Sequence, residues 1–205
     1  LPLGTDAINA THVAHAACCK LAYGVVLPTL YAGTERERDP ACLQALGFAQ
    51  DDYIVGMDFP SRRWNSHYLP EEIFALSVSW SLRMLLQQNY RYIFIANGHG
   101  AVNHQQVLER LRVAFSHETP AQVDFCLTFD EALLADNSAG HAEAYETSLM
   151  MYYNADSVDI DTLPPQPEPL HYTDYSIVDG KGFTSGHDPE HIVRNADPRD
   201  ATRQQ

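Results

Sequence analysis

The feature that most constrains this chain is an apolar run that ends directly in a turn with a histidine. Residues 92–96 read Tyr-Ile-Phe-Ile-Ala, the turn Asn-Gly-His-Gly follows at 97–100, and a helix-like segment covers residues 105–114. We therefore expect a buried strand, a glycine turn and a helix, which is the repeating unit of parallel α/β sheets. Ligands of such sheets bind beyond the carboxyl ends of the strands, so His99 is a candidate for chemistry.

Further segments of both kinds surround this unit. We expect helices over residues 7–23, 71–88 and 142–154, and strands over residues 25–28 and 123–127. This alternation predicts a single α/β domain with a mostly parallel sheet flanked by helices, spanning residues 1–162. Residues 163–205 begin with a proline-rich stretch and have few periodic apolar residues. They are expected to form an extended C-terminal arm that packs on the core or on a neighbouring subunit.

The charge balance limits the partners of the protein. Thirteen Lys and Arg against 27 Asp and Glu give a formal net charge of −14, which disfavours nucleic acid and anionic membranes. No apolar run approaches the roughly 20 residues that span a bilayer, and no charged-then-apolar leader opens the chain. The four cysteines show no Cys-x-x-Cys spacing, which favours reduced thiols. We expect a cytoplasmic protein that acts on a small-molecule substrate.

Three segments carry side chains of types that can bind metal ions. They contain Asp6 at a helix start, His99 after a strand, and the pair His141 and Glu146 in the Gly-His-Ala-Glu-Ala-Tyr-Glu-Thr-Ser stretch at 140–148. Carboxylates and imidazoles are ligands of divalent ions that activate water. Glu146 follows His141 by five residues, so in a regular helix the two side chains would point about 140° apart around the axis. Both reach one site only if His141 lies at the helix start, where residues leave the helical path. The alternative for a lone histidine is a structural hydrogen bond.

The remaining candidates have simpler interpretations. We expect His12, His15, His104 and His117 to be helix-surface or packing residues, and His67 to be a pocket-lining candidate. Glu71 and Glu72 suit the first turn of a helix. The chain has no Gly-x-Ser-x-Gly motif, phosphate-binding loop or dinucleotide glycine motif. A covalent serine or cysteine mechanism is therefore unsupported.

Taken together, the segments 1–6, 97–103 and 140–148 resemble the creatininase, or creatinine amidohydrolase, family in order and approximate separation. The resemblance implies a creatininase-like α/β fold, a metal-dependent hydrolase with two divalent ions (Zn, Mn or Fe), and a homo-oligomer, often a hexamer. It implies that Asp6 bridges the two ions, that His99 and Glu146 are further ligands, and that His141 is the catalytic proton-transfer residue. In the family a Glu-x-His-Gly segment with two more ligands precedes the first motif, so these are expected before Leu1.

Two departures from the creatinine-cleaving members bear on the substrate. Those members have a glutamate two residues after the motif histidine, where this chain has Ala101, and tryptophans near the catalytic histidine, whereas Trp64 and Trp80 lie well upstream. We therefore expect hydrolysis of a cyclic amide or a related non-peptide C–N bond other than creatinine. One alternative is a ring-opening C–C hydrolase of an oxidised inositol-type cyclic ketone. The other is an oligomeric binding or scaffold protein with an incomplete metal site.

Overall fold

The computed structural model of the chain describes residues 4–35, 40, 44, 49–50, 68–129, 144–168, 170–173, 176–178 and 197–203. These residues fall into two compact units. One unit draws on Ala10–Arg38 and Tyr53–Thr128, and the other on Leu1–Asn9, Asp39–Asp52 and Phe129–Gln205.

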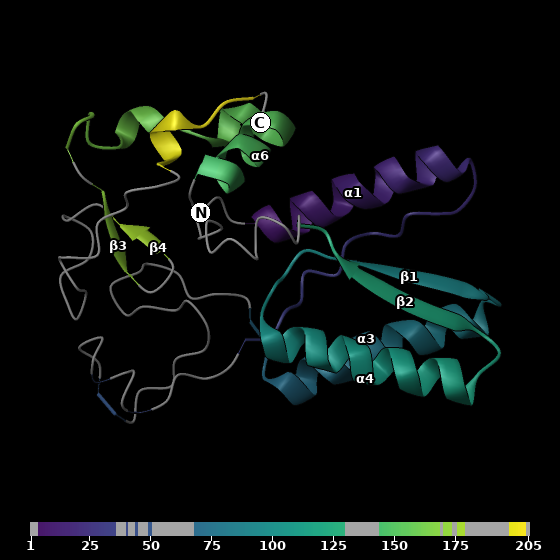
Figure 1. Cartoon of the computed structure of the whole chain (residues 1–205). Coiled ribbons are helices and arrows are strands. Elements are labelled where there is room, and N and C mark those ends of the chain that lie inside the picture. Colours follow the sequence, from purple (N-terminus) through teal and green to yellow (C-terminus); the bar gives the residue numbers. More distant parts are fainter. Residues whose placement is uncertain are drawn as a thin grey trace. The chain divides into compact units, whose positions relative to one another are not determined.

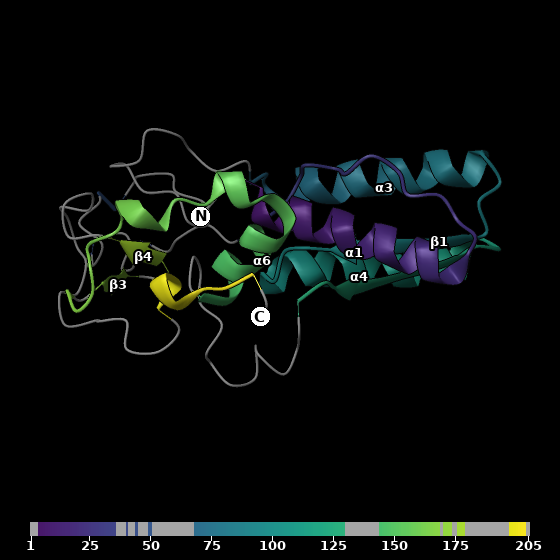
Figure 2. The same cartoon turned by 90° about the horizontal axis from the view of Figure 1, so that it is seen from above.

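The first unit contains the strand–helix–strand arrangement that the sequence predicts. Its elements are α3 (Glu71–Gln87), β1 (Tyr92–Asn97), α4 (Val102–Glu118) and β2 (Gln122–Leu127). The two strands are parallel and pair from Tyr92↔Gln122 to Asn97↔Leu127, with α4 as the crossover between them. Helices α3 and α4 run side by side over one face of this sheet (Figures 1 and 2). The α/β class is therefore confirmed.

The core of this unit lies between the two helices and the two strands. Helix α3 contributes Phe74, Val78 and Leu82, which recur every fourth residue and so share one helix face. The strands contribute Ile93 and Val123, which are direct partners in the parallel register. The members that α4 contributes are Val107, Leu108 and Phe115. Burial of each large apolar side chain favours the folded state by about 1.5–3 kcal/mol, so this face fixes the position of the loop after β1.

Helix α1 (Thr5–Leu21) agrees with the predicted first helix and carries Asp6 in its first turn. The helix ends where Ala22 and Gly24 adopt positive φ angles of 57° and 116°, a backbone conformation that ends helices. The strand predicted over residues 25–28 is wrong, because this stretch has no regular structure. Val25 and Leu27 are exposed, and Pro28 has no N–H group to donate to a neighbouring strand.

The second unit is built around α6 (Ala144–Asn154), whose start matches the predicted last helix within two residues. The remaining elements are η1 (Ala155–Ser157), η2 (Ile160–Thr162), β3 (His171–Thr173), β4 (Ser176–Val178) and η3 (Pro198–Asp200). Strands β3 and β4 pair antiparallel within the predicted arm. The arm boundary at residue 162 stays a prediction. No helix in the described part of the chain is long and apolar enough to cross a membrane.

Candidate functional site

The loop after β1 holds His99 by its backbone. The side chain of Asn97, the last residue of β1, accepts a hydrogen bond from the His99 N–H (3.0 Å) and donates one to the His99 carbonyl (2.9 Å). The Asn97 carbonyl in turn accepts from the backbone N–H of Thr128 (2.8 Å), just after β2. His99 is only 8% exposed. The prediction that His99 follows the carboxyl end of a strand is thus confirmed. The predicted burial of that strand is correct only in part, because Tyr92 and Phe94 are exposed.

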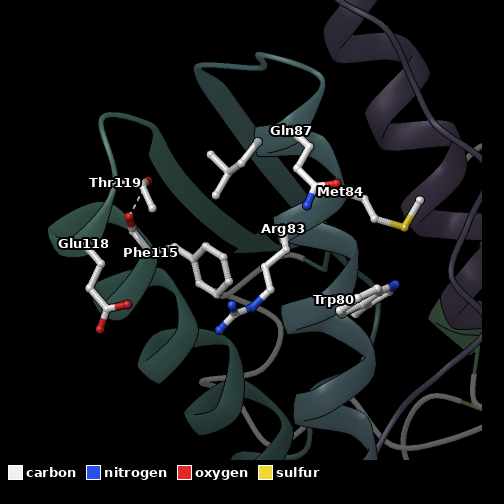
Figure 3. A pocket seen from close by; sticks show the side chains of 8 residues that line it. Trp80, Arg83, Met84, Gln87, Phe115, Glu118 and Thr119 are labelled. Carbon is white, nitrogen blue, oxygen red and sulfur yellow. Dashed lines mark hydrogen bonds between the residues drawn. The ribbon is translucent and has the colours of Figure 1, made fainter.

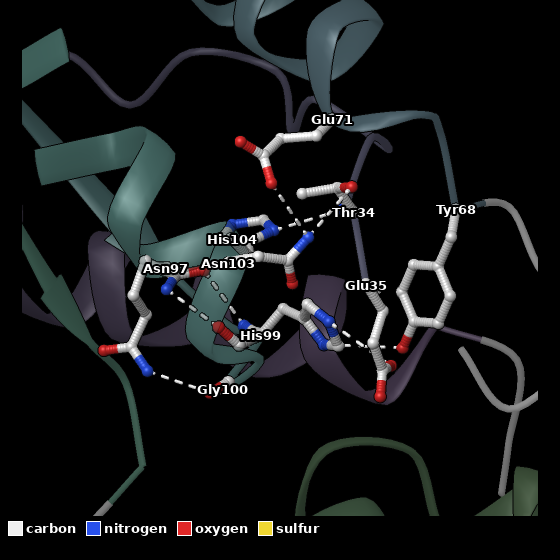
Figure 4. A network of polar contacts seen from close by, with 10 residues as sticks. Thr34, Glu35, Tyr68, Glu71, Asn97, His99, Gly100, Asn103 and His104 are labelled. Carbon is white, nitrogen blue, oxygen red and sulfur yellow. Dashed lines mark hydrogen bonds and ion pairs between the residues drawn. The ribbon is translucent and has the colours of Figure 1, made fainter. Parts of the chain in front are cut away.

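Oxygen atoms lie beside both ring nitrogens of His99 (Figure 4). The Tyr68 hydroxyl is 3.4 Å from Nδ1, and the two rings pack with centroids 4.8 Å apart. The Glu35 carboxylate is 3.7 Å from Nε2. Residues from two segments far apart in the sequence therefore meet at this ring, and all three belong to the first unit.

A buried polar network supports the segment that carries Glu35. Its neighbour Thr34 is fully buried, donates its backbone N–H to Nδ1 of His104 (3.4 Å), and lies 3.5 Å from the Asn103 side-chain amide. Asn103 also contacts the Glu71 carboxylate (3.4 Å) (Figure 4). Both Asn103 and His104 lie in the first turn of α4. The start of α4 therefore fixes the backbone next to Glu35.

His104 is a packing residue, as expected, and it also accepts a hydrogen bond. Its ring lies 4.3 Å from the Phe74 ring, centroid to centroid, and 5.1 Å from that of His99. Burial, and then the nearby His99, lower the pKa of His104 to about 3. A neutral His104 can accept the Thr34 N–H at its unprotonated Nδ1, which suits the observed 3.4 Å contact.

Asp6 and Glu146 belong to the second unit, each in the first turn of its helix. The hydroxyl of Tyr153 in α6 donates to the side-chain oxygen of Asn9 in α1 (3.0 Å). Glu146 lies seven residues before Tyr153, and Asp6 three residues before Asn9, so each acid is on the helix face that this bond joins. Glu146 is buried, at 6% exposed.

His141, the predicted proton-transfer residue, lies outside the described residues, as does His67. The roles of Asp6, His99, His141 and Glu146 therefore stay predictions. The structure places Asp6 and Glu146 in one unit and His99 in the other.

A hollow of about 350 Å³ lies on the first unit, lined by the second half of α3 and the end of α4 (Figure 3). Trp80, Arg83 and Phe115 are among its walls, and the Arg83 guanidinium lies 5.9 Å from the centre of the Phe115 ring. His99 precedes α4, whereas these α4 residues are at its far end, roughly 20 Å away at 1.5 Å per residue. The hollow is therefore separate from the His99 loop.

Comparison with family models decides the membership of the chain. Residues 55–205 match the model described as creatininase, creatinine amidohydrolase. The chain belongs to the creatininase family. The match confirms the predicted creatininase-like α/β fold, and it covers the segments that contain His99, His141 and Glu146. Comparison with curated proteins and with solved structures gave no match.

Creatininase-family proteins generally use a divalent metal such as zinc. Within the described residues, no group of three or more His, Cys, Asp or Glu side chains is arranged to hold a metal ion. The pair of His99 and Glu35 has the right chemistry, because imidazole nitrogen and carboxylate oxygen are both zinc ligands. The residues around His99 therefore fit part of a metal site.

Sequence reasoning missed Glu35 and Tyr68. Glu35 stands in the run Glu-Arg-Glu-Arg-Asp at 35–39, which lies outside every element and candidate segment predicted from the sequence. Tyr68 lies just before the helix predicted over residues 71–88 and outside the candidate segments. The available signal was Gly33, which forms a parallel bridge with Tyr68 and packs against its ring, but a single glycine does not identify its partner.

Proposed function

We propose that this creatininase-family protein is a metal-dependent hydrolase of a cyclic amide or a related non-peptide C–N bond. The observation that carries the proposal is His99, a buried imidazole at the carboxyl end of β1 in a chain that matches the family over residues 55–205. Ligands of α/β sheets bind at this edge. Small-molecule hydrolysis also suits the net charge of −14, which disfavours nucleic acid.

In this proposal Asp6, His99 and Glu146 are metal ligands and His141 transfers a proton. The ions, two in number and of Zn, Mn or Fe, supply a Lewis acid and an activated water when bound. Asn97 keeps His99 in place through two hydrogen bonds to its backbone. His141 takes the proton of the attacking water and passes it to the nitrogen that leaves, so the amide becomes a carboxylate and an amine.

Metal content and activity test the proposal together. The purified full chain is analysed for bound metal and assayed on a panel of cyclic amides, with an oxidised cyclic polyol ketone and an N-formyl compound for comparison. We expect about two metal equivalents and opening of a cyclic amide. Ring opening of the ketone alone would favour the C–C hydrolase, and release of formate would contradict both ring-opening reactions.

Four variants separate the predicted ligands from general effects on the fold. Asp6→Ala and His99→Ala should lose metal and activity while they stay folded by circular dichroism. The matched controls are Asp156→Ala and His117→Ala, which remove the same side-chain types at exposed positions of the same two units. Normal activity in either Asp6→Ala or His99→Ala contradicts the assigned roles.

A further inference from the structure

Glu35 faces the ring nitrogen of His99 that Tyr68 does not contact (Figure 4). We propose that Glu35 is a metal ligand that shares one divalent ion with Nε2 of His99, and that Tyr68 holds the His99 ring from its other nitrogen. This inference rests on the proposed function, because it takes His99 as a ligand. It adds a ligand from the segment 33–35, which neither the sequence motifs nor the family match includes.

The distance between the two side chains suits a shared ion. The 3.7 Å from Nε2 to the Glu35 oxygen is too long for a hydrogen bond. A zinc ion lies about 2.1 Å from each such ligand, so two ligands at a tetrahedral angle are about 3.4 Å apart. At an angle of 120° the same bond lengths give about 3.6 Å. Glu35 and His99 are therefore spaced as two ligands of one ion.

Tyr68 determines which His99 nitrogen is available. Its hydroxyl oxygen can accept the Nδ1–H at 3.4 Å, and the proton on Nδ1 leaves the lone pair on Nε2, which is the nitrogen beside Glu35. Metal-bound histidines generally donate their other N–H to an oxygen acceptor that fixes the ring. The packing of the Tyr68 ring against the His99 ring adds a second restraint on its orientation.

The backbone around Glu35 is held firmly enough to present a ligand. The Gly33 carbonyl accepts the Leu69 N–H (2.7 Å), which links the segment to the residue after Tyr68. Thr34 is fully buried against His104 and Asn103 of α4. The side chain of Glu35 itself is 29% exposed. A carboxylate on a fixed backbone, open to solvent on one side, can bind an ion that enters from solution.

Zinc affinity of the full chain is the decisive measurement. The metal-free protein is titrated with Zn²⁺ in competition with a chromophoric chelator, for the wild type and three variants. Glu35→Gln keeps the size of the side chain but removes the charge, and we expect its zinc affinity to fall by more than about 100-fold. Changing a residue that only hydrogen-bonds to a metal ligand typically lowers metal affinity by about 10- to 100-fold, which is less than the loss expected here. Glu35→Asp keeps the carboxylate on a side chain that is one methylene shorter, and it should lose less zinc affinity than Glu35→Gln.

The control is Glu118→Gln, at the exposed end of α4 in the same unit, which should bind zinc as the wild type does. Thermal melting of the metal-free proteins checks that Glu35→Gln is folded. Wild-type zinc affinity in folded Glu35→Gln overturns the proposal for Glu35, even where His99→Ala loses zinc and the hydrolase proposal stands. A wild type that binds no zinc, manganese or iron overturns both.

Discussion

The side chain of Asn97 makes two hydrogen bonds to the backbone of His99: it accepts one from the N–H at 3.0 Å and donates one to the carbonyl at 2.9 Å. Both residues are buried, at 5% and 8% exposed. Because Asn97 is also the last paired residue of β1, the sheet positions His99 directly. The side chain of Asn97 thus holds the backbone of the candidate ligand at the end of the strand.

Asn97→Ala removes both of these bonds and leaves the backbone groups of His99 buried. We expect it to lower the free energy of unfolding by about 1–3 kcal/mol, the cost of unsatisfied buried groups, and to weaken zinc binding. Asn97→Asp keeps the acceptor for the N–H and should lose less zinc affinity. The measurements are urea denaturation and zinc titration, with the exposed Asn154→Ala as control. Unchanged zinc affinity in Asn97→Ala would show that the loop is positioned by other contacts.

Tyr68→Phe removes the hydroxyl beside Nδ1 of His99 and keeps the ring that packs on it. Loss of an oxygen acceptor next to a metal-bound histidine typically weakens metal binding by about 10- to 100-fold. We expect the zinc affinity of Tyr68→Phe to fall by a factor of that size. Tyr92→Phe is the control, because Tyr92 is 82% exposed on β1. Equal zinc affinities of Tyr68→Phe and Tyr92→Phe would mean that the hydroxyl does not orient the ring.

The sequence predicted helices whose apolar residues follow a regular period. Helix α3 was predicted over residues 71–88 and spans Glu71–Gln87, because its apolar residues recur at helical spacing. The strand predicted over 25–28 failed for the opposite reason. Its four residues are apolar but are not buried by a partner in the described residues, and a short apolar run carries no period that separates a strand from an exposed connection.

The candidate site was predictable only where a residue adjoins a regular element. His99 follows β1, and Asp6 and Glu146 lie in first helical turns, so their neighbours in sequence indicated their places. Glu35 meets His99 through a long-range contact that depends on the Gly33–Tyr68 bridge. No local pattern encodes such a contact. The residues that sequence reasoning missed are therefore those placed by tertiary packing alone.

Leu108→Ala tests the core that supports this loop. Leu108 is 2% exposed in the cluster between α3, α4 and the strands. Its truncation should lower the free energy of unfolding by about 2–5 kcal/mol, because apolar contacts are lost and a cavity remains. The control is Leu76→Ala, because Leu76 is 64% exposed on α3. This variant should change the free energy of unfolding by about 0.5 kcal/mol or less. Similar losses in the two variants, measured by urea denaturation, would contradict the core assignment.

Acid pH should destabilise the turn formed by Asp197 and η3 in the second unit. Asp197 accepts hydrogen bonds from the side chain and the backbone N–H of Arg199. These bonds hold the pKa of Asp197 below its ordinary value of 3.8, and the side-chain bonds contribute most. Arg199 also donates to the carbonyls of Pro164 and Glu168. A carboxyl whose pKa is lower in the folded state stabilises that state above its ordinary pKa, and the stabilisation is lost as the pH falls below 3.8.

Asp197→Asn removes this charge at every pH. At pH 7 the amides of residues 199–202 should be less protected from hydrogen exchange in the variant than in the wild type, by about 0.5–1.5 kcal/mol of opening free energy. The difference should shrink as the pH falls below 3.8, because the wild-type carboxyl then becomes neutral too. Asp159→Asn, at an exposed position of the same unit, is the control. A difference that stays constant from pH 7 to pH 2 would show that the hydrogen-bond geometry of Asp197, and not its charge, holds the turn.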